Sequence, residues 1–449
     1  GACSEPERSS EQESSPEVRP AAAPAPEIAA PDLVTAPPFN PDSGDLLLRC
    51  GGVIDGVSDE VLKATAVLVQ DGRISAIGRD IGAPAGTPLL ELPEHTCLPG
   101  LIDMHTHLME EFNVPLTDFY QNSAASTVAT GRNFAHSTLM AGFTSVRNLG
   151  VYYGGTSLTM RDEIDRGEAI GPRMQAAVFY LSIPAGGGDI VVPGIPEETI
   201  PGQLRQGIAR GADEFRVKAQ AAVDSGAGVL KIIASGAVLA HGSVPGAPEM
   251  TPEEIAAVVE VAQTAGIPVT AHAHGAESVR DAILAGVDSI EHASLADEEG
   301  IRLAAENNVA FSMDIYNGDW IASEYRKQNK PEEFLRKNDE TTLSQRETFA
   351  RAHRAGVDIV YGTDAGVYPH GMNANQFRYM VNWGMSEMEA IQAATSVAAR
   401  VLQWQDRVGA LQPGLYGDIV AVKGNPLEDI RRLEAVDTVI KCGLVFKAP

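Results

Sequence analysis

The pattern of apolar and polar positions changes twice along the chain. Residues 45–97 contain short apolar runs separated by turns at Gly and Asp, and residues 409–449 show the same pattern. Between them, near-continuous apolar runs are separated by amphipathic stretches, which is typical of parallel strands covered by helices. The pattern therefore predicts an α/β region at 98–408, flanked by strand-rich segments from both ends of the chain.

Eight strands are predicted in the central region. They are 100–107, 144–149, 173–179, 229–235, 267–274, 288–294, 309–315 and 358–366. Several follow a Gly that ends a helix, as in AGFTSV and AGVDSI. The helix after Thr251 has a capping box with Glu254 and ends at Gly266. Eight such units predict a TIM-type (β/α)8 barrel, with a small β-sandwich formed from 45–97 and 409–449.

Residues 1–44 have a different composition from the rest. They are rich in Pro, Ala, Ser and Glu and contain few large apolar side chains, so they predict a disordered tether. The opening Gly-Ala-Cys-Ser resembles the end of a bacterial lipoprotein signal, which makes Cys3 a candidate lipid anchor; a chance Cys in a tail is the alternative. The lipoprotein interpretation predicts an exported protein, periplasmic or tethered to a membrane.

Charge and cysteine content narrow the possible functions. The formal net charge of -26 argues against nucleic-acid binding, which needs a basic surface. Cys50, Cys97 and Cys442 show no metal-type spacing. Cys50 and Cys97 are predicted to be core thiols, and a bond from either one to Cys442 in an oxidising compartment stays open.

Titratable residues gather at the carboxyl ends of the predicted strands, where barrel chemistry occurs. They are His105 and His107 on the first strand, Lys231 on the fourth, His272 and His274 on the fifth, His292 on the sixth and Asp364 on the eighth. Residues two apart share one face of a strand, so the H-x-H pair can point inward together. Imidazole and carboxylate are ligands of transition metals, so the set predicts a metal site.

Each of these residues also has a simpler interpretation. A single buried His is usually a hydrogen-bonded core residue, and a Lys often extends its charged end from a buried stem to solvent. Five histidines at the ends of three strands, with an Asp at a fourth, favour the metal site over coincidence.

The motifs PGLIDMHTHL, KIIASGAV, TAHAHG, SIEHAS and GTDAG together resemble the amidohydrolase superfamily, over residues 45–449. Within it, the chain is similar to the branch of Xaa-Pro dipeptidases, metallo-carboxypeptidases and imidazolonepropionase-like proteins, and to bacterial amidohydrolases that split ochratoxin A. The resemblance implies a homo-oligomer with two divalent metal ions, usually zinc. His105, His107 and Asp364 would hold the buried ion, His272 and His292 the exposed one, and a carboxylated Lys231 would bridge them.

The resemblance also implies a reaction. The substrate would be a dipeptide or N-acyl amino acid with a free C-terminal carboxylate, with ochratoxin A, which would release phenylalanine, among the candidates. Asp364 would take a proton from the attacking water and deliver it to the leaving nitrogen. His274 would contact the substrate carbonyl or support a ligand, and Asp103 would orient one. Candidates for binding the substrate carboxylate are Tyr316, Arg216, His241 and Ser243, and the Gly-rich stretch 179–194 would frame the pocket.

Two alternatives remain from the sequence. One is a cyclic amide or lactone hydrolase that uses the same metal site without a carboxylate anchor. The other is a non-catalytic exported binding protein that keeps the fold.

Overall fold

The computed structural model describes residues 40–449, which belong to one compact unit. Most of the predicted tether, including Cys3, lies outside the described residues. Within the described part, no helix is both long enough and apolar enough to span a bilayer.

Strands from both ends of the chain form one seven-stranded sheet in the order β16-β15-β14-β4-β1-β2-β3. The central contact pairs β14 with β4 in antiparallel fashion, with Val420 opposite Leu98, as the sequence pattern predicts. β1 and β4 run parallel, and the other pairs are antiparallel. The strands are β1 (Leu46–Val53), β2 (Leu62–Gln70), β3 (Arg73–Gly78), β4 (Leu89–Pro99), β14 (Ile419–Lys423), β15 (Thr438–Lys441) and β16 (Leu444–Lys447).

The central region contains only parallel strand pairs, in two sheets. One has the order β5-β6-β7 and the other β13-β12-β11-β10-β9-β8. Backbone hydrogen bonds join the end of β5 to the segment after β13, from Met104 N to Tyr361 O (2.8 Å) and from Asp364 N to His105 O (2.7 Å). The strands are β5 (Leu101–Thr106), β6 (Phe143–Asn148), β7 (Arg173–Ala176), β8 (Tyr180–Leu181), β9 (Leu230–Ile233), β10 (Val269–Gly275), β11 (Ser289–Leu295), β12 (Ala310–Ser312) and β13 (Ile359–Val360).

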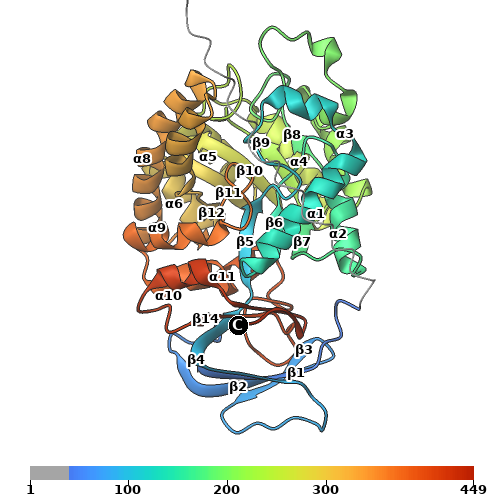
Figure 1. Ribbon diagram of the computed structural model, residues 1–449. Coiled ribbons are helices and arrows are strands. Elements are labelled where there is room, and N and C mark those ends of the chain that lie inside the picture. Colours follow the sequence, from blue (N-terminus) through green and yellow to red (C-terminus); the bar gives the residue numbers. More distant parts are fainter. Residues whose placement is uncertain (1–39) are drawn as a thin grey trace, which may run out of the picture. The chain divides into compact units, whose positions relative to one another are not determined.

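Helices flank these parallel strands on both sides, and the seven-stranded sheet lies at one end of them (Figure 1). The α-helices are α1 (Ala124–Met140), α2 (Thr156–Asp165), α3 (Gly211–Asp224), α4 (Pro252–Ala265), α5 (Ala276–Ala285), α6 (Glu298–Asn307), α7 (Asn317–Trp320), α8 (Glu332–Arg354), α9 (Gln376–Asn382), α10 (Glu387–Ala393) and α11 (Ser396–Val401). Short helical turns are η1 (Leu116–Gln121), η2 (Glu197–Thr199), η3 (Gly202–Leu204), η4 (Ile321–Tyr325), η5 (Asn373–Asn375) and η6 (Ile430–Ala435).

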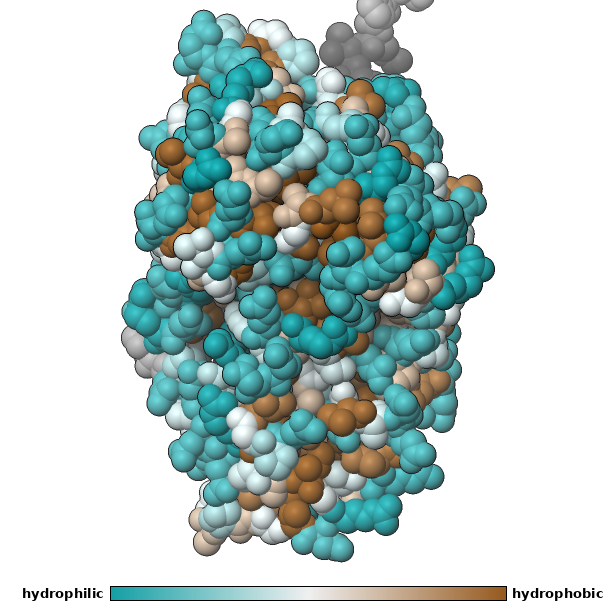
Figure 2. All heavy atoms as spheres, turned by 180° about the vertical axis from the view of Figure 1, so that it is seen from behind, coloured by the Kyte–Doolittle hydropathy of each residue, from teal (hydrophilic) through white to brown (hydrophobic). Residues whose placement is uncertain are grey.

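Local sequence signals explain where helices begin and end. Thr251 and Glu254 form the predicted capping box of α4, and Gly266 ends that helix in a left-handed conformation. The apolar faces of the helices pack on the parallel strands in the largest core cluster. Polar side chains cover most of the face seen in Figure 2, with apolar side chains in scattered groups between them.

The cysteines depart from the sequence expectation. Cys50 and Cys97 form a disulfide, with their Cα atoms 6.1 Å apart, whereas Cys442 is buried and free. The prediction of two core thiols is therefore wrong, and the bond to Cys442 that the sequence left open does not form. The physical reason is register: β1 and β4 are neighbours, with Val53 opposite Cys97, so both cysteines lie in one pair of strands.

The disulfide should contribute to the stability of the seven-stranded sheet. A Cys50→Ser/Cys97→Ser variant is expected to lose about 2–4 kcal/mol in the free energy of unfolding, because the bond restricts the unfolded chain. Urea unfolding measures the loss. A reducing agent should lower the unfolding midpoint of the parent protein and leave that of the variant unchanged. Equal midpoints for parent and variant would contradict a stabilising role.

Candidate metal centre

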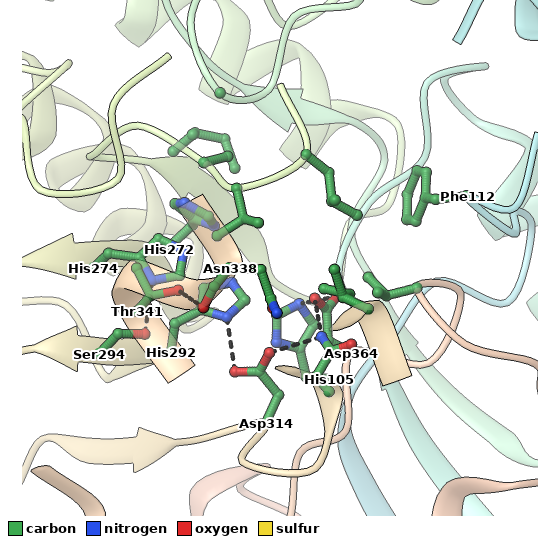
Figure 3. Close-up of a pocket in the computed structure, with 18 of the residues that line it drawn as sticks. His105, Phe112, His272, His274, His292, Ser294, Asp314, Asn338, Thr341 and Asp364 are labelled. Carbon is green, nitrogen blue, oxygen red and sulfur yellow. Dashed lines mark hydrogen bonds and ion pairs between the residues drawn. The ribbon is translucent and has the colours of Figure 1, made fainter. Parts of the chain in front are cut away.

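The carboxyl ends of the parallel strands bring the seven predicted titratable residues to one cavity. His105, His107, Lys231, His272, His274, His292 and Asp364 all line it. In Figure 3, His272, His274 and His292 lie together on one side, and His105 and Asp364 lie opposite them. Convergence of residues from five strands or strand ends agrees with the sequence prediction.

Two of these residues have an unusual backbone conformation. His292 has φ of 71° and Asp364 has φ of 57°. A positive φ is uncommon for residues other than Gly, and such strain concentrates at functional sites. The surrounding hydrogen bonds must hold these two positions in place.

The distances between donor atoms fit metal coordination. His105 Nε2 and His107 Nε2 lie 3.2 and 3.1 Å from Asp364 Oδ1, and Lys231 Nζ lies 3.4 Å from His105 Nε2. Two ligands of one tetrahedral zinc, each about 2.0–2.1 Å from the ion, lie about 3.3 Å apart. The donors on this side of the cavity therefore have the spacing of ligands to a shared cation.

A second group of donors lies beside the first. The ligand atoms of His272, His274 and His292 lie within 4.8 Å of one another, and the same holds for His105, His292 and Asp364. His292 belongs to both groups. Two adjacent groups that share one residue are compatible with a pair of metal ions.

Burial sets the protonation states that a metal needs. It lowers the pKa of His105 to about 4 and that of His274 to about 3, and holds the pKa of His272 well below its usual value. Burial opposes ionisation of Asp364, but His105 and His107 hold the pKa of this carboxyl below its usual value. Near neutral pH, His105, His272 and His274 are therefore neutral imidazoles and Asp364 is a carboxylate, the forms that bind metal. Burial also opposes protonation of His292, but its partner Asp314 raises the pKa of this ring above its usual value.

Lys231 differs from an ordinary lysine. It is only 2% exposed, and burial lowers the pKa of its amine to about 8. A larger fraction of this amine is uncharged near neutral pH, and only an uncharged amine can react with carbon dioxide to form a carbamate. The residue at this position thus fits the chemistry that the bridging role requires.

Four of the cavity histidines have Nδ1 held by a partner, and the fifth, His272, has Nε2 held 3.0 Å from the carbonyl of Gly236. The Nδ1 atoms lie 2.8–2.9 Å from a partner oxygen in each case: His105 with Glu291, His107 with Tyr180, His274 with Ser294 and His292 with Asp314. Such partners orient the ring and leave Nε2 for a metal or substrate.

The sequence analysis did not identify these partners. A weak signal existed for Glu291, which directly precedes His292 in an apolar strand, and for Asp314, which lies near the end of the predicted seventh strand. Neither signal says which histidine the carboxylate would contact.

Asp103 joins the first and last strand ends. Its Oδ1 accepts the backbone N–H groups of His105 and Thr363 (both 3.1 Å), and its Oδ2 accepts the Thr363 hydroxyl (2.6 Å) and the Asn373 amide (2.8 Å). It therefore orients the backbone at His105 and the residue before Asp364.

The residues proposed to bind the substrate carboxylate do not line the cavity. Arg216 lies on α3, where it pairs with Asp213 and Glu260, so its predicted contact with substrate is corrected. The other three are His241, which pairs with Glu333, Ser243, which bonds Glu249, and Tyr316, which packs on Tyr368. These side chains are held by partners in the protein, and they support the wall instead of facing into the cavity.

Apart from Asp314, which pairs with His292, the rest of the wall is neutral. Apolar and aromatic side chains come from Phe112, Tyr152, Tyr180, Leu239, Ile321 and Val367, and amide or hydroxyl groups from Asn338, Thr341 and Thr342. Gly187 and Gly188 of the predicted Gly-rich stretch also line it. Lys231 is the one Lys or Arg among the described lining residues.

His292 is the residue whose loss should affect the metals most. His292→Ala is expected to lower metal content below that of the parent, because this imidazole lies next to both donor groups and its free Nε2 can ligate one ion. Metal analysis of the purified protein measures the effect. His353→Ala is the matched control, since His353 lies outside the cavity and pairs with Glu389. Full metal content in the His292 variant would contradict its role as a ligand.

Comparisons with known proteins agree with this geometry. Residues 96–445 match the model of the amidohydrolase family. Ochratoxinase of Aspergillus niger is 29% identical over a 440-residue alignment that covers 91% of this chain and 88% of that protein. Imidazolonepropionase of Haloarcula marismortui is 23% identical, over 90% of this chain and 94% of that protein.

Solved structures are similar over about nine-tenths of the chain. A Xaa-Pro dipeptidase with methionine bound in its active site is 35% identical, with a TM-score of 0.84, covering 90% of this chain and 100% of that one. The crystal structure of the Aspergillus niger ochratoxinase is 28% identical, with a TM-score of 0.79, covering 91% and 96%. The chain therefore belongs to the amidohydrolase family and is a metal-dependent hydrolase of carbon–nitrogen bonds.

Proposed function

We propose that this chain hydrolyses the amide bond to a C-terminal amino acid in a dipeptide or N-acyl amino acid, with ochratoxin A among its substrates. The observation that carries the proposal is the set of paired donor groups around His292, in a cavity whose wall is largely apolar and partly aromatic. Ochratoxinase and a Xaa-Pro dipeptidase are both similar over about nine-tenths of the chain. An apolar wall suits an apolar side chain such as that of phenylalanine.

The proposed centre holds two divalent ions, zinc being the usual metal of the family. His105, His107 and Asp364 would hold one, His272 and His292 the other, and carboxylated Lys231 would bridge them. When bound, such ions polarise a carbonyl and lower the pKa of water. Two dications would strongly disfavour a free ammonium at Lys231, whereas a carbamate there supplies an anionic bridge.

The chain's own residues would move the proton and position the substrate. Asp364 accepts a hydrogen bond on Oδ2 from Asn317 (3.2 Å) and faces the cavity, where it would take a proton from water and deliver it to the leaving nitrogen. His274 would hydrogen bond the substrate carbonyl through Nε2, because Ser294 holds its Nδ1. Asn338 Nδ2 donates one N–H to the carbonyl of Gly318 (2.9 Å) and would have its second N–H for the substrate carboxylate, whereas the hydroxyls of Thr341 and Thr342 already donate to backbone carbonyls.

We also propose the remaining features of the architecture. The two parallel sheets would be the parts of one TIM-type barrel, and the seven-stranded sheet would fold as a β-sandwich. The protein would be an exported homo-oligomer, lipid-anchored through Cys3. The Cys50–Cys97 bond supports export, since disulfides persist mainly in oxidising compartments.

A cyclic amide hydrolase is the second candidate. The similarity to an imidazolonepropionase and the lack of an Arg among the described lining residues both favour a substrate without a carboxylate. The non-catalytic binding protein is set aside, because the chain is a metal-dependent enzyme by family and ligand set.

The test is an assay of the purified protein on a substrate panel. N-acetyl-phenylalanine, Xaa-Pro dipeptides and ochratoxin A are compared with cyclic amides, with and without a chelator and after adding zinc and bicarbonate. Release of a C-terminal amino acid that the chelator abolishes is the expected result. Hydrolysis of cyclic amides alone would replace the proposal with the second candidate.

Asp364→Asn is expected to lower kcat by about 10²–10⁴-fold, because an amide cannot carry the proton. Steady-state kinetics on the best panel substrate measure the loss, and metal analysis of the same sample separates it from loss of the ions. Asp319→Asn is the control, since Asp319 pairs with Arg346 and does not line the cavity. A kcat equal to the parent value would remove Asp364 from the proton path.

A further inference from the structure

An arginine lies buried among the parallel strands without a role in the proposed reaction. Arg147, on β6, is 0% exposed and comes from the predicted strand TSVRNL. Its partner Glu291, on β11, is also 0% exposed. Burying two charges is costly, so their arrangement calls for a physical reason.

Three hydrogen bonds fix the guanidinium. Arg147 Nε donates to the carbonyl of Met104 (2.8 Å), Nη1 to the Ser289 hydroxyl (2.9 Å) and Nη2 to Glu291 Oε1 (2.6 Å). These partners lie on β5 and β11, so the side chain connects three strands. The Thr270 hydroxyl, on β10, also donates to Glu291 Oε1 (2.5 Å).

The second carboxylate oxygen of Glu291 lies next to a predicted metal ligand. Glu291 Oε2 lies 2.9 Å from His105 Nδ1, and Nε2 of the same ring lies 3.2 Å from Asp364 Oδ1. A continuous path of contacts therefore runs from Arg147 through Glu291 to a predicted ligand. Neither Arg147 nor Glu291 lines the cavity, so neither can contact substrate directly.

Stability alone explains this arrangement poorly. Replacing a buried ion pair with apolar side chains of similar volume is often neutral or stabilising. A carboxylate behind a ligating imidazole, in contrast, fixes the proton on the remote nitrogen and sets the orientation of the ring. Arg147 in turn fixes the carboxylate, because its planar fork sets the direction of the bond.

We propose that Arg147 and Glu291 are positioning residues that hold the His105 ring, with Nε2 toward the cavity, ready to bind a metal ion. The inference rests on the proposed metal centre. It adds two residues to the site, Glu291 behind His105 and Arg147 behind Glu291, which would contact neither metal nor substrate. Its effect should appear in metal affinity, before any substrate is added.

The experiment measures zinc binding to metal-free protein by competition with a chromophoric chelator, for the parent and for Arg147→Met and Glu291→Gln. Both variants are expected to bind zinc about 10–100-fold more weakly. A simple charge effect predicts the opposite sign for Arg147→Met, because removing a cation should strengthen zinc binding. Weaker binding in both variants therefore supports positioning, and tighter binding in Arg147→Met would overturn it.

Arg173→Met is the matched control. Arg173 is also largely buried and ion-paired, with Asp418 at 3.1 Å, but it does not line the cavity or contact any predicted ligand. Parent-like zinc affinity in this variant is the expected result, even if its stability falls. An equal loss of affinity in Arg173→Met would overturn the proposal in favour of general destabilisation.

A double variant, Arg147→Met/Glu291→Leu, removes both charges together. Recovery of parent-like zinc affinity would show that the single variants act through an unpaired buried charge, which would overturn the proposal. Continued weak binding in a folded double variant supports it. If Arg147→Met does not fold, as judged by circular dichroism, Arg147→Lys replaces it, because it keeps the charge and removes the planar fork. Weaker zinc binding in Arg147→Lys supports positioning, and parent-like binding would overturn it. No substrate is used, so a parent that binds zinc but cleaves nothing on the panel would reject the proposed function and leave this result standing.

Discussion

The hydrogen bonds of Asp103 are the constraint on which the rest of the centre depends. One carboxylate accepts N–H groups from both His105 and Thr363 and so joins the first strand end to the last. These two segments lie near opposite ends of the central region in sequence. In the fold, the Nε2 atoms of His105 and His107 nevertheless lie 3.2 and 3.1 Å from Asp364 Oδ1. Together with the backbone hydrogen bond from Asp364 N to His105 O (2.7 Å), this connection fixes the distance between the two halves of the donor set.

Burial then determines what the converged side chains can do. Water is largely excluded from His105, His272 and His274, so protonation of these rings is disfavoured and their lone pairs remain available. Carboxylates placed behind the rings, Glu291 and Asp314, compensate for the buried polarity and orient the imidazoles. The same low dielectric would strengthen the electrostatic interactions between the site and any charge that develops on a substrate in the cavity.

Most of the cavity wall around these polar groups is apolar or aromatic. Around the histidines, Phe112 and Tyr180 each pack edge to face with Tyr152, and the Tyr180 hydroxyl also lies 2.9 Å from His107 Nδ1. A single residue thus belongs both to the wall and to the support of a predicted ligand. Substitutions chosen to alter substrate preference at this position would alter the metal centre as well.

Much of the site was predictable from the sequence, because it depends on local pattern. A run such as GLIDMHTH specifies a buried strand, and the carboxyl end of that strand must lie with those of its parallel neighbours. The side-chain chemistry of His105, His107, His272, His292 and Asp364 then points to a metal. Pairing of the two chain ends in one sheet followed from the same alternating pattern.

Only the tertiary structure decided which side chains touch across strands. The Cys50–Cys97 bond depends on the parallel register of β1 and β4, which short apolar runs do not encode. The contact of Glu291 with His105 and Arg147 depends on three strands meeting, and the pairing of Arg216 on α3 depends on the neighbouring helix. The sequence by itself determined the strands and the kinds of ligand, because periodicity and side-chain chemistry are local. Partners and distances between remote segments were set by packing, because they exist only in the folded chain.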